Sequence, residues 1–401
     1  MISSRLPSNY IVSQIASDIV SKQYELAQVQ EQISSGKKVN RPSDEPAYSA
    51  RILSMREATS KLEQYDRNSS AAESQLSLEE GALDGVVNNI NRIRELALTA
   101  NNGIVNETTR QAIHAEVKLQ LDELYTLANS RDSFNNFIFG GNNNQSTPFS
   151  KGEPVVYSGS DDASEMPIGL GRKVKTGDSG LDVFMRIRNG NGTFVTSLNP
   201  ANTGSGTISQ GSVTDTTAYD RDTYRVQFTS STTYDVINDT TGATVSTSNT
   251  HTDTGPIEFN GIRTVISGVP EPGDSFTIEP SKNQDLFSTV SKFISALDQT
   301  PTTSSDTAKY TQAVNDAILN LDTGLDHINN IRSGVGARLN SIDSSREQNS
   351  NVQLQIERVL TDVEDIDIAE AVTNLQTQAN SLEILQKSFS RIEGLSLFNY
   401  M

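Results

Sequence analysis

Two pairs of carboxylates have the residue type and the spacing for general acid–base chemistry. Asp161 with Asp162 forms one pair and Asp220 with Asp222 the other, and both lie in a stretch rich in Gly and Pro. Two carboxylates in one pocket can hydrolyse a glycosidic bond, one as the acid and the other as the base. Turn formation explains Asp residues in such a stretch equally well. We therefore expect the chain not to be an enzyme.

The remaining residue types exclude most cofactor chemistry. The 401 residues include no Cys and three His, so thiolate nucleophiles, disulfides, Cys-ligated zinc and iron–sulfur clusters are excluded. We expect His114 and His251 to be surface residues, on a helix and in a Thr/Ser-rich loop. Gly334-Val335-Gly336 lacks the following Lys-Ser/Thr of a phosphate-binding loop and is expected to interrupt a helix. No cofactor is expected.

A short acidic run, Glu364, Asp365, Asp367 and Glu370, has oxygen ligands of the kind that calcium prefers. It lacks the Gly and the ligand spacing of a calcium-binding loop. A solvated helix face explains it better. We expect no metal site.

The charge balance argues against nucleic acids, because 32 Lys and Arg against 50 Asp and Glu give a net charge of −18 and no basic cluster interrupts it. No apolar run approaches the roughly 20 residues that cross a bilayer, so membrane insertion is not expected. The segment Met1 to Val20 lacks the unbroken apolar core of a Sec signal peptide, and any export would use another route.

Near the N-terminus, apolar residues alternate at spacings of three and four, which predicts a helix with a coiled-coil seam. Lys22 alone interrupts the pattern, and Ser34-Ser35-Gly36 ends the helix. The seam consists of Val12, Ile15, Ile19, Leu26, Val29 and Ile33.

The loop that follows, residues 40–46, contains Arg41, Pro42 and Asp44. Ser43 or Asp44 is expected to cap the next helix, with Pro46 in its first turn. That helix continues to about residue 100, and another covers about 107–130. A rigid Pro turn between two helices would set their relative angle, so we predict that Arg41 and Asp44 fix a hinge or a subunit contact.

The C-terminal part predicts helices over about 285–299, 305–346 and 350–395. The last has a second seam at the same spacings. An intramolecular two-helix contact and packing between subunits both remain open for the two seams. The second seam consists of Ile368, Val372, Leu375, Leu382, Leu385, Phe389 and Ile392.

Between Gly140 and Pro280 lie 18 of the 26 Gly and 8 of the 12 Pro. Apolar and polar residues alternate over 183–188, resume over 193–196 and alternate again over 224–229, which predicts strands. Asn260-Gly261 between two short apolar runs predicts a type I′ hairpin. The fold class is therefore α+β: a long, discontinuous helical coiled-coil rod built from N- and C-terminal segments, with an inserted small antiparallel β domain.

Four segments resemble a known family. Residues 32–47 (QISSGKKVNRPSDEPA) resemble the N-terminal signature of the flagellin superfamily, and Asn-Arg-Pro-Ser-Asp resembles its hook-associated protein 3 branch. The other three are 137–141 (FIFGG) with 147–149 (TPF), 333–340 (SGVGARLN) and 395–401 (LSLFNYM).

The resemblance implies a structural protein of the bacterial flagellum, exported unfolded through the flagellar type III channel, at the hook–filament junction. It implies a homo-oligomeric ring that contacts hook-associated protein 1 and flagellin, and an export chaperone on the C-terminal region. The expected domains are 1–40 with 356–401 for assembly, 41–139 with 283–355 as helical rod, and 140–282 as outer β domain. A filament flagellin, or a secreted adhesin that binds glycans through the β domain, remains the alternative.

Overall fold

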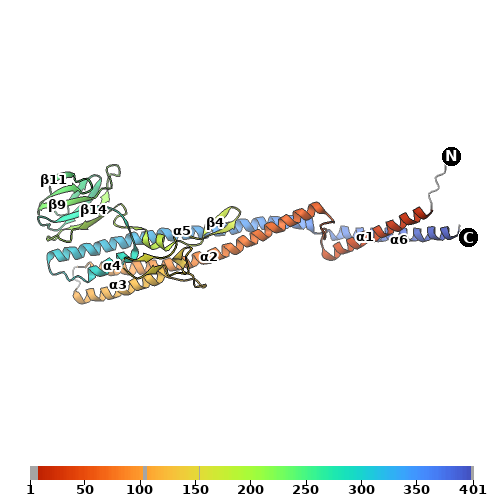
Figure 1. Cartoon of the computed structure of the whole chain (residues 1–401), viewed down its shortest axis with the longest axis horizontal. Helices are drawn as coiled ribbons and strands as arrows, with labels where there is room; N and C mark the ends of the chain where they lie inside the picture. Colours follow the sequence, from red (N-terminus) through yellow and green to blue (C-terminus); the bar gives the residue numbers. More distant parts are fainter. Residues whose placement is uncertain (1–7, 103–105, 153, 399–401) are drawn as a thin grey trace. The chain divides into compact units, whose positions relative to one another are not determined.

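The computed structural model describes residues 8–102, 106–152 and 154–398, and the side chains among them except those of residues 8, 9 and 392–398. Long helices precede and follow a small antiparallel β domain, which confirms the predicted fold class (Figure 1). The helices are α1 (Ser8–Ser35), α2 (Pro46–Ala100), α3 (Glu107–Ala128), α4 (Leu286–Leu297), α5 (Ser304–Glu364) and α6 (Ile368–Phe398). Among the described residues, no helix combines the length and apolar character needed to cross a bilayer.

The chain divides into two compact units. The terminal unit comprises residues 1–67 and 345–401, and the central unit comprises residues 68–344. In the terminal unit α1 packs against α6, although the two helices stand at opposite ends of the chain.

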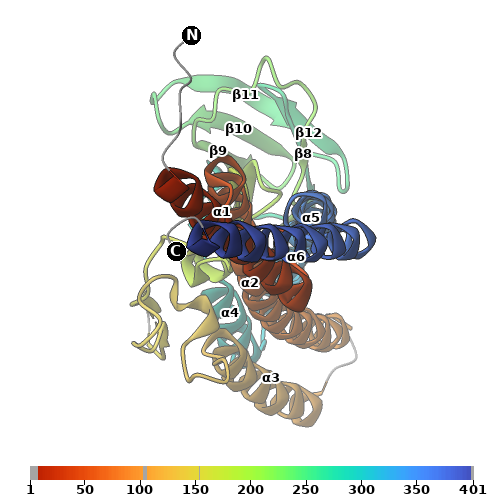
Figure 2. The ribbon, with the colours of Figure 1, turned by 90° about the vertical axis from the view of Figure 1, so that its right-hand side faces the viewer.

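In the central unit, apolar side chains of α2, α3, α4 and α5 form one core. These side chains recur every third or fourth residue, as on the buried stripe of an amphipathic helix. Figure 2 shows the labelled strands of the β domain on one side of this unit and α3 with α4 on the other. Fully buried members are Leu76, Leu83, Ile90, Val117, Leu124, Val290, Phe293, Val314, Leu321 and Ile328.

The β domain contains two larger antiparallel sheets, ordered β11-β10-β9-β14-β6 and β12-β13-β7, with β8 also pairing β13. Buried residues of both sheets share one core, so the sheets pack face to face. Their strands are β6 (Phe194–Leu198), β7 (Thr207–Ile208), β8 (Ser212–Val213), β9 (Tyr224–Ser230), β10 (Thr233–Asn238), β11 (Thr244–Thr250), β12 (Pro256–Phe259), β13 (Ile262–Ser267) and β14 (Ser275–Pro280).

Three short two-stranded pairs connect this domain to the helices. A 3₁₀ turn, η1 (Ile138–Gly140), and a π-helical turn, η2 (Leu181–Met185), lie among them. The pairs are β1 (Phe149–Ser150) with β2 (Val156–Tyr157), β3 (Glu165–Gly169) with β4 (Arg172–Lys175), and β5 (Ile187–Arg188) with β15 (Asn283–Gln284).

The Asn260-Gly261 hairpin is confirmed. It joins β12 to β13, whose ends pair as Phe259 with Ile262. Both central residues have positive φ, 41° at Asn260 and 73° at Gly261. Positive φ at both positions is the requirement of a type I′ turn.

The strand predicted over residues 183–188 is wrong for its first half. Val183 and Phe184 belong to the turn η2, and only Ile187–Arg188 forms a strand. The side chains of Val183 and Phe184 are fully buried, and the Phe184 ring meets the Phe139 ring edge-on at a centroid distance of 5.2 Å. A helical turn places two adjacent side chains in one core, whereas a strand would point them to opposite faces.

Two predicted helix breaks are also wrong. Gly334-Val335-Gly336 lies inside α5, and α5 continues without interruption through residues 346–350 to Glu364. Val335 is fully buried in the helical core, so packing outweighs the low helix propensity of Gly. The break occurs instead at 365–367, where the Asp367 carboxylate accepts the Ala369 amide (2.9 Å) and caps α6.

One face of α5 holds the inserted segments through a row of polar side chains, which we call the polar stripe. Its members are eight, three and four residues apart along α5, so they share a face. The contacts join Gln312 Oε1 to Ile208 N (2.9 Å), Asn320 Oδ1 to Gly190 N (2.9 Å), Thr323 Oγ1 to Gly190 O (3.1 Å) and His327 Nε2 to Asp182 O (2.7 Å).

Candidate functional site

The predicted N-terminal seam lies in α1, and each of its six residues is half-buried against α6. Lys22, which interrupts the pattern, pairs with Glu25 at 2.6 Å. The two-helix contact therefore covers the seam only in part, and apolar surface of both helices stays exposed.

The C-terminal seam divides into two parts. Leu375, Leu382, Leu385 and Phe389 are half-buried, whereas Ile368 and Val372 are 62% and 49% exposed. Ile392 belongs to α6, but its side chain lies outside the described residues, as does part of the 395–401 motif. The first turn of α6 therefore presents apolar side chains that no described partner covers.

A second apolar face on α1 was missed by the sequence analysis. Tyr10, Val20 and Tyr24 are 58%, 65% and 62% exposed, and at 100° per residue they lie on the side of α1 away from the seam. Ser13, Ser17 and Ala27 lie on the same face, so that the six residues follow one another at spacings of three and four. A second search at spacings of three and four would have found this face.

The loop between α1 and α2 is closed by Asp44. The Asp44 carboxylate accepts the Arg41 backbone N–H (2.9 Å), and the Asp44 amide donates to the Arg41 carbonyl (3.0 Å). Since α2 begins at Pro46, Asp44 closes the turn and does not cap the helix as expected. The Arg41 guanidinium pairs with Glu31 of α1 (3.0 Å), and Pro42 is exposed between them.

Glu364 connects this loop to the end of α5. Its carboxylate, only 10% exposed, pairs with Arg56 (2.6 Å) and with Lys37, and its carbonyl accepts the Lys38 amide (2.7 Å). Burial acts to raise the pKa of Glu364, but the Lys37 hydrogen bond and the Arg56 charge outweigh it and lower that pKa. The expectation of a solvated face is wrong for Glu364, whereas Asp365, the next residue, is exposed.

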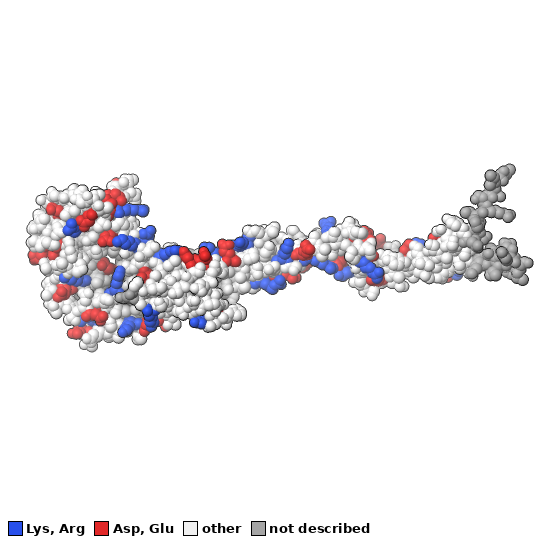
Figure 3. All heavy atoms as spheres, in the orientation of Figure 1, with Lys and Arg blue, Asp and Glu red and all other residues white. Residues whose placement is uncertain are grey.

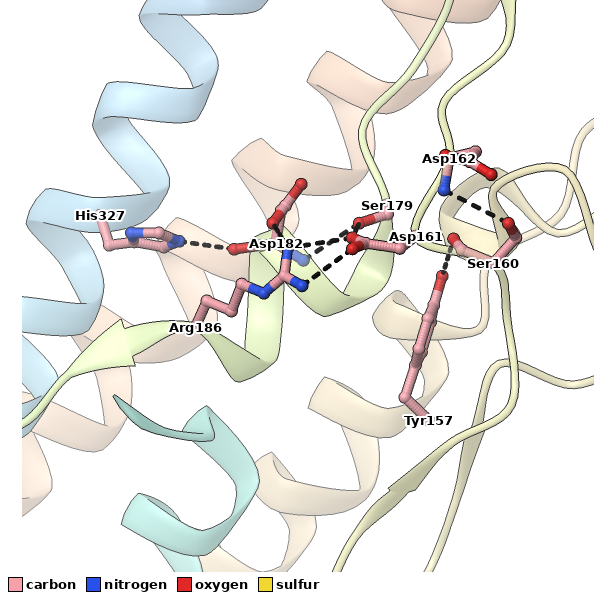
Figure 4. Close-up of polar contacts among 8 residues, drawn as sticks. All are labelled: Tyr157, Ser160, Asp161, Asp162, Ser179, Asp182, Arg186 and His327. Carbon is pink, nitrogen blue, oxygen red and sulfur yellow. Dashed lines mark hydrogen bonds and ion pairs between the residues drawn. The ribbon is translucent and has the colours of Figure 1, made fainter. Parts of the chain in front are cut away.

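Asp161 and Asp220, one member of each carboxylate pair considered for acid–base chemistry, are engaged in structural contacts. Figure 4 shows Arg186 between Asp161 and Asp182, at N–O distances of 2.8 and 2.5 Å. The Arg186 hydrogen bond lowers the pKa of Asp161. In the other pair, both Asp220 oxygens accept the Tyr224 hydroxyl (2.6 Å). These contacts hold loops and strands together.

The histidines are placed differently from the expectation. His251 is buried and meets the Phe228 ring edge-on at 5.2 Å, so its prediction as a surface residue is wrong. His114 is partly exposed and lies 3.2 Å from Asp298. Within the described residues, no three His, Asp or Glu side chains gather as metal ligands would.

Residues of the central motifs have structural roles in the core. Phe139 and Phe149 pack edge-on against Phe184 at 5.2 and 5.3 Å. Gly141 has a φ of +60°, and a Cβ there would lie 2.2 Å from the Ser160 carbonyl oxygen. Only Gly fits this turn.

Arg338, from the 333–340 motif, completes a buried ion cluster. Its Nη2 lies 2.7 Å from both Asp178 oxygens, and the Asp178 amide donates to Glu79 Oε1 (2.9 Å). Glu79 is fully buried. Burial, and then the Asp178 charge, raise the pKa of Glu79 to about 8.

The charged surface does not favour one sign on the face that Figure 3 shows, where Lys and Arg are interspersed with Asp and Glu. This distribution differs from the continuous basic stripe of a nucleic-acid interface.

Comparisons with known proteins agree with these features. Residues 7–144 match the model of the bacterial flagellin N-terminal helical region. Residues 197–280 match the D2-like domain of flagellar hook-associated protein 1, so the β domain has a likeness that the sequence motifs did not reveal.

One relative covers nearly the whole chain, and two solved structures cover about three quarters of it. Flagellar hook-associated protein 3 of Escherichia coli K12 is 23% identical over 396 residues, 98% of both chains. A crystal structure of Xanthomonas campestris FlgL is 29% identical, with a TM-score of 0.71, and covers 76% of this chain and 99% of that one. The crystal structure of Legionella pneumophila flagellar hook-associated protein 3 is 30% identical, with a TM-score of 0.74, over 78% of this chain and 98% of that one. The chain therefore belongs to the flagellar hook-associated protein 3 (FlgL) family of structural flagellar proteins.

Proposed function

We propose that the chain forms the junction between hook and filament and serves as the adaptor on which flagellin polymerises. The observation that carries the proposal is the apolar surface left exposed on α1 and α6, including Tyr24, Ile368 and Val372. Exposed apolar patches of this kind are typical of protein–protein contacts. The likeness to the flagellar junction protein FlgL of Legionella pneumophila, which is 30% identical, supports the same role.

The proposed partners follow from this role. Copies of the chain assemble into a ring, with hook-associated protein 1 on one side and flagellin on the other. The chain is secreted through the flagellar export channel, held beforehand by a chaperone on its C-terminal region. It catalyses no reaction, in keeping with the engagement of Asp161 and Asp220 in structural contacts.

The domain assignment remains a proposal as well. We assign assembly to the terminal helices, residues 1–40 and 356–401. The helical rod comprises residues 41–139 and 283–355, and the outer β domain comprises residues 140–282. The exposed seam residues Ile368 and Val372 favour this assignment.

The loop around Arg41 is proposed as a hinge or contact within this assembly. We expect Asp44→Ala to reduce the number of filaments more than Arg41→Ala, because Asp44 closes the turn while the exposed Arg41–Glu31 pair contributes only about 0–1 kcal/mol. Ser43→Ala, in the same exposed loop, is the matched control. Normal filament assembly by both variants would show that the loop has neither role.

Deletion of the gene tests the junction role. We expect cells that build hooks without filaments and release flagellin monomers into the medium. Complementation with the full chain should restore filaments. A chain without its last 20 or so residues should not, because the truncation removes much of α6 and thus the surface against which α1 packs. Normal filaments in the deletion strain would refute the proposal.

A further inference from the structure

A cleft of about 530 Å³ lies in the terminal unit, where residues 37–42 meet the first turns of α2. Its lining contains both apolar and cationic side chains. Leu53, at one side, is 61% exposed. The apolar and cationic residues of the lining include Lys37, Val39, Arg41, Ala50, Leu53 and Arg56.

The cleft carries an excess of positive charge in a chain whose net charge is −18. Lys37 and Arg56 share one carboxylate, that of Glu364, and this is the one acidic residue in the lining. The side chains of Arg41 and Arg56 are 58% and 57% exposed, so each has room for a further partner.

The same unit presents a surface of complementary character at the start of α6, which we call the acidic ridge. Ile368 and Val372 are four residues apart, share a helix face and are both exposed. Asp365, Asp367 and Glu370 beside them are exposed as well. The ridge thus combines an apolar pair with carboxylates, and the cleft combines apolar side chains with cations.

We propose that the cleft of one copy receives the acidic ridge of a second copy of this chain. Lys37 and Asp365 form a backbone bridge, so the two surfaces adjoin in one copy, but Leu53, Ile368 and Val372 stay exposed and remain available to a neighbour. Charge complementarity selects this occupant, since the ridge supplies carboxylates for Lys37, Arg41 and Arg56 and apolar side chains for Val39 and Leu53. The inference rests on the proposed junction role and gives its ring a specific contact.

The contact joins two different surfaces, so it is heterologous. Each copy that offers its ridge still has a free cleft, and repetition therefore adds copies in one direction. Such a contact closes into a ring when the rotation between copies permits it. A symmetric dimer, by contrast, would use both surfaces and stop at two copies.

A charge exchange tests the pairing in cells that carry the gene deletion. We expect Leu53→Glu and Ile368→Lys each to reduce filaments per hook by about tenfold or more, because each places like charges together. The combination Leu53→Glu with Ile368→Lys should restore filaments to within about twofold of the unsubstituted chain, because the two new charges attract. Both positions are more than 60% exposed, so the variants should fold.

The matched control combines Leu53→Glu with Ile384→Lys, a change at another exposed position of α6 (64%). This combination should keep the Leu53→Glu defect. The proposal is overturned if single variants assemble normally, if the exchange gives no recovery, or if the control recovers equally.

Cysteine cross-linking separates a contact between copies from one within a copy, because the chain contains no Cys of its own. In isolated flagella, Leu53→Cys with Ile368→Cys should give an oxidation-dependent ladder of multimers beyond the dimer. A cross-linked monomer alone, or a dimer alone, would overturn the proposal. Filaments restored by the full chain without any ladder refute this contact only, whereas normal filaments in the deletion strain refute the junction role itself.

Discussion

Glu79 illustrates how a single residue makes the central unit sensitive to pH. It lies fully buried beside the Asp178–Arg338 ion pair, and its Oε2 has no hydrogen-bond partner among the residues that the structure describes. Because its pKa is raised to about 8 in the folded chain from a usual 4.5, the folded state binds more protons than the unfolded state between these values. The free energy of unfolding must then fall as pH rises through this window.

We therefore expect Glu79→Gln to stabilise the chain relative to the unsubstituted protein at about pH 8 and to have little effect well below pH 4.5, where Glu79 is protonated in both the folded and the unfolded state. The amide keeps the acceptor for the Asp178 N–H and removes the buried charge. The difference in unfolding free energy should grow by at most roughly 1.4 kcal/mol per pH unit. Urea unfolding of both proteins across this range measures it, and a difference independent of pH would contradict the account.

At the scale of the elements, apolar spacing predicted the helices well because long amphipathic stripes have few alternatives. Both seams lie on the predicted helices, and all six residues of the N-terminal seam and four of the C-terminal seam are half-buried. The cleft could not be predicted, since it joins residues 37–56 to Glu364, more than 300 positions away. The Asp367-x-x-Glu370 pattern was a usable signal for the start of α6 that the solvated-face interpretation overlooked.

The glycines inside α5 give a prediction of their own. A Cβ at Gly336 would meet nothing within 4 Å, so Gly336→Ala should stabilise the chain by about 0.5–1 kcal/mol through higher helix propensity. Thermal unfolding measures the change. Gly85→Ala in α2 is the contrast, because a Cβ there would lie 2.8 Å from Leu127 Cδ2. An equal or larger gain at Gly85 would contradict this explanation.

The polar stripe on α5 predicts which contact keeps the inserted segments in place. Asn320→Ala should leave the buried Gly190 amide without an acceptor, at a cost of about 1–3 kcal/mol. We expect faster protease cleavage near residues 189–192 while the helices resist digestion. Asn315→Ala, an exposed change one turn away, is the control. Equal cleavage of both variants would show that the stripe does not hold this loop.

At the scale of the whole molecule, the terminal helices bury less apolar surface than the central unit does. Core residues of α2 and α5, such as Leu83 and Leu321, are fully buried, whereas the α1 seam is only half-buried. Burial that is completed by neighbouring copies offsets the ordering entropy only on assembly. We therefore predict that residues up to about 35 and beyond about 355 are disordered in the free monomer.

Limited proteolysis of the purified monomer measures this directly. Both termini should be removed before the central unit is cleaved, and a pre-assembled form should protect them. Survival of both termini for as long as the central unit would contradict the prediction.

The central claim, that this chain occupies the junction between hook and filament, is tested most directly by its position in isolated flagella. Antibodies against the β domain, viewed by immunogold electron microscopy, should mark a single narrow band where the hook ends and the filament begins. Labelling along the entire filament would identify a flagellin, and labelling of the cell surface away from flagella would identify an adhesin. Either of these patterns would contradict the account.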